Sequence, residues 1–168
     1  MKKLSALLGF CWVFGFTVSY AQAATVEVEF TDPDKYVDIR SGEKHSKHFR
    51  DDVFYNVEKQ LKKLAKDLPE EQVLMVKFTD MDLAGDIRMS HGRLMRVVTQ
   101  MYAPRLAFSY ELVDKDKNIL KQGEENIRNT SFMSNQSLRY RNDALGFEKH
   151  LLEKWFDEAF EEKLITAK

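Results

Sequence analysis

Val26-Glu27-Val28-Glu29-Phe30 alternates strictly between apolar and acidic side chains. A period of two predicts a β-strand whose apolar side chains share one buried face, while the acidic ones face solvent. The aspartate–proline pair at 32–33 then ends the strand. The fold is therefore expected to begin with a half-buried strand at residues 25–30.

An amphipathic helix follows over residues 49–68. Its apolar side chains recur at spacings of three and four residues, and Pro69 marks its end. The next apolar run, residues 73–79, alternates as the first does and predicts a second strand. A strand, a helix and a strand in this order predict two parallel strands joined by a right-handed crossover. The apolar positions of the helix are Phe49, Val53, Val57, Leu61, Leu64 and Leu68.

The second half of the chain supplies three more strands and a helix. A weak strand pattern covers residues 94–101, and clear alternation covers 106–112. A polar turn at 114–118 leads into a partner strand at 119–127. The helix at 147–160 has a broad apolar face that suits packing across a sheet. The sequence therefore predicts an α+β fold, a two-layer sandwich with a mixed four- to five-stranded sheet and two main helices on one face (β-α-β-β-β-β-α).

The first residues have the pattern of a secretory signal peptide. Two lysines open the chain, residues 4–18 form an apolar run, and Ala21-Gln22-Ala23 offers small residues for a signal peptidase. We expect cleavage near Ala23 and a periplasmic protein, with one domain over residues 24–168. The apolar run is short for a membrane span, so no membrane anchor is expected.

The cysteine content and the net charge further limit the kind of protein and the kind of partner. Cys11 is the only cysteine and lies in the predicted leader, so the exported chain must be held together by packing without disulfides. The formal net charge is −1, from 26 basic and 27 acidic residues. This balance carries no electrostatic footprint for nucleic acid, which excludes that class of partner.

Acidic residues follow both strands of the parallel pair. Asp32 comes after the first strand, and Asp80 and Asp82 come after the second. The carboxyl ends of parallel strands meet at one edge of a sheet, where ligands tend to bind. Clustered carboxylates there could hold a divalent cation such as calcium. The alternative is structural: the carboxylates accept backbone N–H groups in a turn.

A second set of candidates is basic and aromatic. The segment 128–142 is long for a loop, and it carries Arg139, Tyr140 and Arg141. Arginine forks bind carboxylate and phosphate groups, so these residues could hold a small ligand. Tyr102 and Arg105 are weaker candidates of the same kind. The alternative is that the loop packs on the core and its arginines pair with surface acids.

Four segments of the chain resemble a bacterial family called domain of unknown function 3016. They are residues 30–40, 79–85 and 102–105, together with a tail that begins at 138–141 and continues to residues 155–156. Ala103 replaces a proline that is usual in the family, and Phe147 replaces a common tyrosine. The resemblance implies a compact exported domain without an assigned activity, so it transfers no catalytic residue.

The sequence therefore favours a non-enzymatic binding or cell-envelope accessory domain, with no catalytic residue assigned. Its partner would be an envelope protein or a small ligand, and no cofactor is expected, although a divalent cation remains open. The alternative is a metal-assisted hydrolase built on Asp32, Asp80 and Asp82. A third possibility is a structural domain that assembles through the edge of the hairpin at 105–127.

Overall fold

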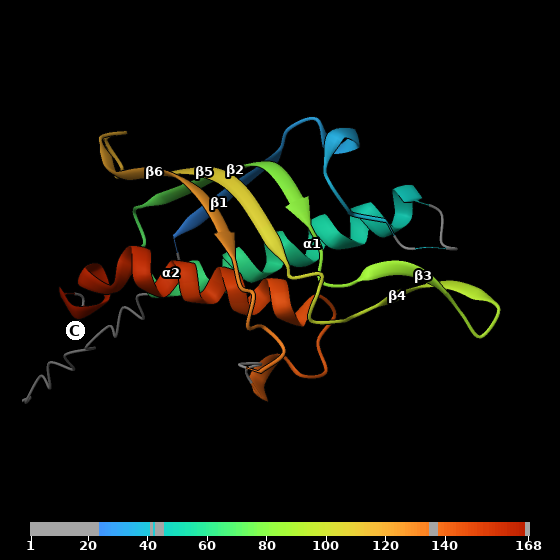
Figure 1. Ribbon diagram of the computed structural model, residues 1–168. Helices are drawn as coiled ribbons and strands as arrows, with labels where there is room; N and C mark the ends of the chain where they lie inside the picture. Colours follow the sequence, from blue (N-terminus) through green and yellow to red (C-terminus); the bar gives the residue numbers. More distant parts are fainter. Residues whose placement is uncertain (1–23, 41, 43–45, 135–137, 167–168) are drawn as a thin grey trace, which may run out of the picture.

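The structure is a computed structural model, shown in Figure 1, and it describes residues 24–40, 42, 46–134 and 138–166. For residues 46, 138 and 161–166 it describes the backbone alone. The predicted signal peptide lies outside the described residues.

A four-stranded sheet forms one layer of the molecule. Its strands are β1 (Thr25–Phe30), β2 (Val73–Asp82), β5 (Arg105–Val113) and β6 (Ile119–Arg128), in the order β1-β2-β5-β6. β1 runs parallel to β2, and the other neighbours are antiparallel. The predicted parallel pair and the predicted hairpin are both confirmed.

Two helices cover one face of this sheet (Figure 1), as the sequence predicts. They are α1 (Ser46–Leu64) and α2 (Gly146–Thr166), and the short 3-10 turns are η1 (Pro33–Lys35), η2 (Ala65–Asp67) and η3 (Leu138–Tyr140). The alternating apolar residues of the strands meet the apolar stripes of both helices in one core cluster. Trp155 of α2 lies edge-on to Phe108 and Tyr110 of β5, with ring centroids 4.7 and 5.2 Å apart.

β3 (Asp86–Ser90) and β4 (Arg93–Val97) form a separate two-stranded sheet. We call this hairpin, residues 86–97, the arm, and Figure 1 shows it projecting away from the main sheet. The expected strand at 94–101 therefore differs from the structure, since β4 ends at Val97 and pairs with a strand that the sequence analysis did not predict. The arm turns at His91 and Gly92, whose φ angles of 50° and 74° suit a two-residue hairpin turn.

Candidate functional site

The carboxyl ends of β1 and β2 lie at one edge of the sheet. Asp80 and Asp82, which were expected to follow β2, belong to the strand itself. β2 continues through Asp82, past a register shift between Phe78 and Asp80. The expectation that Asp80 and Asp82 follow the strand is therefore wrong. The cause is pairing with β5, which extends β2 beyond its alternating apolar run. Asp38 bridges Asp82 in parallel, so the loop after η1 lies beside the end of β2.

Asp80 and Arg105, predicted for two different sites, are partners of each other. Asp80 forms an ion pair with Arg105, and its Oδ1 accepts the backbone N–H of Val37 at 2.8 Å. Arg105 also donates to Asn126 Oδ1 at 3.2 Å. The Asp80 carboxylate thus joins the loop after η1 to β2 and β5, which agrees with the structural alternative.

Asp32 and Asp82 have different surroundings. Asp32 is an exposed residue with φ 50°, and its Oδ2 pairs with Lys35 Nζ at 2.8 Å. Burial and then the negative charge of Asp38 raise the pKa of the Asp82 carboxyl, although Arg105 opposes the shift. Within residues 24–40, 42, 46–134 and 138–166, no three His, Cys, Asp or Glu side chains are grouped to hold a metal ion. Cation binding by Asp32, Asp80 and Asp82 stays a prediction.

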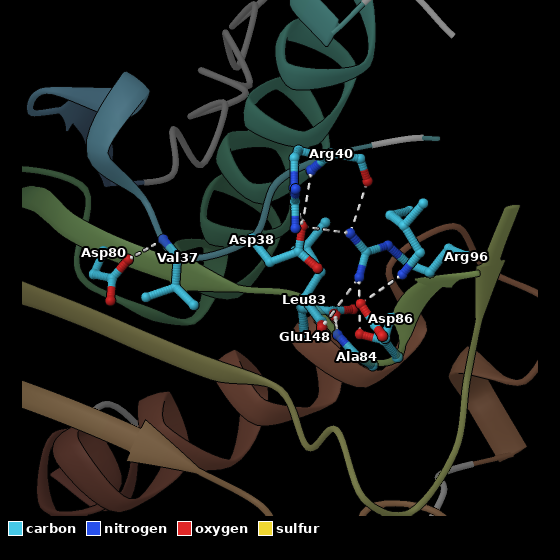
Figure 2. Close-up of polar contacts among 11 residues, drawn as sticks. Val37, Asp38, Arg40, Asp80, Leu83, Ala84, Asp86, Arg96 and Glu148 are labelled. Atoms are coloured by element: carbon cyan, nitrogen blue, oxygen red, sulfur yellow. Dashed lines mark hydrogen bonds and ion pairs between the residues drawn. The ribbon is translucent and has the colours of Figure 1, made fainter. Parts of the chain in front are cut away.

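Arg96 is the centre of the polar network shown in Figure 2. Its Nη2 lies 3.1 Å from Asp38 Oδ1 and donates to the Arg40 carbonyl at 2.7 Å. Its Nη1 donates to the carbonyl of Gly85 at 3.0 Å and, more weakly, to that of Leu83 at 3.4 Å. Burial works against the ionised Asp38, but hydrogen bonding and the charge of Arg96 lower the pKa of this carboxyl overall. One arginine therefore ties the base of the arm to two other segments.

Glu148 extends this network to α2. It lies in the first turn of the helix, is fully buried, and accepts the backbone N–H of Ala84 at 2.7 Å (Figure 2). Burial raises the pKa of the Glu148 carboxyl, and the hydrogen bond from Ala84 opposes the shift. The side chain connects the end of β2 to the beginning of α2.

A small cleft of about 190 Å³ lies between the residues that follow β2, the end of the arm and the residues that lead into α2. Arg96 and Glu148 line it together with Arg141, which is exposed and forms no ion pair with any residue that the structure describes. The cleft is smaller than the usual pocket for an organic ligand. A ligand-binding role for Arg141 stays a prediction.

Of the other basic and aromatic candidates, Tyr140 alone lines the cleft with Arg141. Arg139 pairs with Glu153 of α2, and Tyr140 is buried, with its hydroxyl accepting Gln60 Nε2 at 2.8 Å. The Tyr102 ring lies 5.2 Å from the Arg88 guanidinium, on the arm side of the molecule. The structure thus brings Tyr140 and Arg141 to one cleft and places Arg139, Tyr102 and Arg105 elsewhere.

The arm carries the features that the sequence analysis missed. Met89 and Met95 are 68% and 45% exposed, and Leu94 is exposed as well. Met89 and Leu94 are paired on one face of the hairpin, and Met95 lies on the other face with the exposed arginines Arg88 and Arg93. The alternation of apolar and polar residues over 86–90, followed by Gly92, is the signal from which the hairpin could have been predicted.

Close backbone contacts hold the arm at two points, one at its base and one near its turn. A Cβ at Gly85 would lie 2.6 Å from the Val97 carbonyl oxygen, and one at Gly42 would lie 2.5 Å from that of Leu94. Both glycines have positive φ, of 86° and 84°. Together with the hydrogen bonds of Arg96, these contacts hold the arm to the end of the sheet.

The comparisons with known proteins give a family and no activity. A family model described as "Protein of unknown function (DUF3016)" matches residues 24–158. No curated protein and no solved structure matches the chain. Among the helices that the structure describes, none has the length and apolar character needed to cross a membrane.

Proposed function

The chain belongs to the family described as protein of unknown function (DUF3016), and we propose that it is a non-enzymatic binding domain of the periplasm that docks a partner protein through its arm. The observation that carries this proposal is the exposure of Met89, Leu94 and Met95 on a hairpin whose base is held by Arg96. Methionine adapts its shape readily and is common at binding surfaces.

The chemistry of the arm specifies its partner. Burying one exposed methionine or leucine side chain contributes about 1.5–3 kcal/mol. Arg88 and Arg93 add positive charge beside Met95, which favours a partner surface that carries carboxylates around an apolar patch. Because the base of the arm is already ordered, little conformational entropy remains to be lost on binding.

The periplasmic location rests on the predicted signal peptide. The match to the family begins at Ala24, directly after the expected cleavage site. The amino-terminal sequence of protein recovered from a periplasmic fraction should therefore begin at or near Ala24. Recovery of uncleaved protein from the cytoplasm alone would contradict export.

Cross-linking in living cells tests the docking proposal. A photoreactive phenylalanine analogue in place of Met95 should give one discrete adduct with an envelope protein, and the same analogue in place of Lys77, on the uncovered face of the sheet, should not. Arg93→Glu should remove the adduct, because it reverses a charge at the contact. Lys47→Glu makes the same charge change at an exposed residue of α1 and should leave the adduct intact.

Serine substitutions of exposed methionines provide the second part of this test. Met89→Ser should weaken the adduct, whereas Met133→Ser, at a side chain that is 47% exposed and outside the arm, should not. Equal amounts of adduct from all these variants would overturn the proposal, and so would the absence of any adduct from the analogue at position 95. An adduct between two copies of the chain would retain the arm as a docking element and identify the partner as the protein itself.

The metal-assisted hydrolase is tested by stability. If Asp32, Asp80 and Asp82 bound a cation, millimolar calcium, magnesium or zinc would raise the melting temperature. We expect no rise, and we expect Asp80→Asn with Asp82→Asn to lower the melting temperature without added metal, because Asp80 holds Arg105. A metal-dependent rise that the double variant abolishes would favour the hydrolase.

A further inference from the structure

A groove of about 540 Å³ on the helical layer is lined by five lysines. Lys59, Lys62 and Lys63 come from α1, Lys66 comes from η2, and Lys149 comes from α2. The groove involves no residue of the arm. Its volume lies in the range of pockets that hold small organic molecules.

The sequence spacing explains how the lysines converge. Residues 59, 62, 63 and 66 recur at helical spacing and lie on one side of α1 and of the η2 turn that continues it, along roughly 10 Å. A row of lysines on a single helix is ordinarily a solvated face. Here Lys149 of the second helix adds a fifth ammonium group to the same groove, with an exposed fraction of only 12%.

Few carboxylates balance this charge. Lys62 pairs with Glu58, and the Nζ of Lys149 lies 3.6 Å from Asp143 Oδ2. Asp143 is the only carboxylate among the lining residues that the structure describes.

The other three lysines have no carboxylate partner in the part of the chain that the structure describes. Lys59 and Lys63 lie over the rings of Tyr55 and Tyr140, with Nζ 5.9 and 5.6 Å from the ring centroids. The protein as a whole has a formal net charge of −1. This groove is therefore a local concentration of positive charge on a protein without net positive charge.

We propose that the lysine groove binds a ligand with two or more phosphate groups. Lysine ammonium groups act as point charges and bind phosphate without the planar geometry that arginine imposes. Their separation along α1 suits phosphates placed several ångströms apart more than a single small anion. Such phosphates occur on a free sugar bisphosphate or on the headgroups of an anionic lipid surface, and the test distinguishes these sources.

Titration of the protein purified from cells tests the proposal. The probes are fructose 1,6-bisphosphate, phosphatidylglycerol vesicles and neutral phosphatidylcholine vesicles, at low and physiological salt. The variant Lys59→Gln/Lys63→Gln/Lys66→Gln removes three exposed charges from the groove. Its control, Lys47→Gln/Lys115→Gln/Lys117→Gln, removes the same charge from exposed sites elsewhere.

The groove variant should weaken the dissociation constant for the bound probe by about tenfold or more, and the salt dependence of binding should decrease with it. The control variant should change the constant by less than about twofold. Unchanged melting temperatures would establish that both variants fold. Binding of the soluble probe identifies a free phosphorylated ligand, and binding of anionic vesicles alone identifies a lipid headgroup. No binding of either probe at low salt, or equal weakening in both variants, overturns the proposal.

Discussion

Arg96 holds three segments of the chain together with one side chain. Its guanidinium donates to carbonyls of the loop at residue 40 and of the end of β2, and pairs with Asp38. The network occupies Asp38 and both terminal nitrogens of Arg96. Together with the close backbone contacts of Gly42 and Gly85, it fixes the position of the arm relative to the sheet.

Replacing Arg96 should lower the free energy of unfolding. Arg96→Met removes the more buried of the two arginines that pair with Asp38, while Arg40 remains, and should lower the free energy of unfolding by about 1.5–3 kcal/mol. Urea denaturation measures this change. Arg93→Met, at an exposed residue of the same strand, should change it by less than about 0.5 kcal/mol. Similar values for the two variants would show that the network does not stabilise the fold.

Glu148 gives the stability a pH dependence of opposite sign to that of an ordinary paired carboxylate. Its pKa is raised in the folded state, so the folded protein binds this proton more tightly than the unfolded chain does. The stabilisation that comes from this tighter proton binding at Glu148 is fully present below the unfolded pKa of about 4.5. It is lost as pH rises through the folded pKa.

Glu148→Gln should remove this dependence while keeping an acceptor for the Ala84 N–H. The stability of the variant relative to the native protein should therefore increase with pH above about 4.5, the unfolded value. Chemical denaturation at several pH values measures the difference. A difference that does not vary with pH would contradict the raised pKa.

Little of this network could be predicted from sequence. Asp38, Arg96 and Glu148 are far apart in the chain and have no spacing that distinguishes them from other charged residues. Only folding brings them together, through the parallel bridge at Asp82 and the start of α2. It could be predicted that charged groups meet at the carboxyl ends of β1 and β2. It could not be predicted that the carboxylates there pair with arginines.

The helical element α2 depends on its central tryptophan. Trp155 is 4% exposed and packs against β5, so Trp155→Ala should lower the free energy of unfolding by about 3–5 kcal/mol. Its buried Nε1 has no hydrogen-bond partner among the described residues. Trp155→Phe should therefore cost much less, since it keeps an aromatic ring and removes an unsatisfied donor. Circular dichroism during urea denaturation distinguishes the two; a loss below about 1 kcal/mol for alanine would refute this packing.

The elements that the sequence predicted are those that bury one face. Periods of two and of about 3.6 arise from burial, and they locate β1, β5, α1 and α2. β6 has no buried residue, and the polar turn before it is what located it. The arm buries little of either face, so its pattern is weak, and its first strand β3 was not predicted. The extension of β2 through Asp82 depends on pairing with β5, which no local pattern reports.

The whole molecule should fold without an oxidising environment. Cys11, in the predicted leader, is the only cysteine of the sequence, so the chain cannot form a disulfide within itself. Deletion of residues 2–16 should leave the protein in the cytoplasm in a folded state. Its melting temperature should be unchanged by dithiothreitol, and aggregation of the retained protein would contradict folding by packing alone.

The burial of Trp155 also makes the protein its own optical probe. The chain has two tryptophans, and the other one, Trp12, lies in the predicted leader. If the predicted cleavage removes Trp12, the emission comes from a single indole, 5.2 Å from the Tyr110 ring and able to receive excitation from it. A red shift and loss of this energy transfer would signal the moment when α2 leaves the sheet, in the unlabelled native protein.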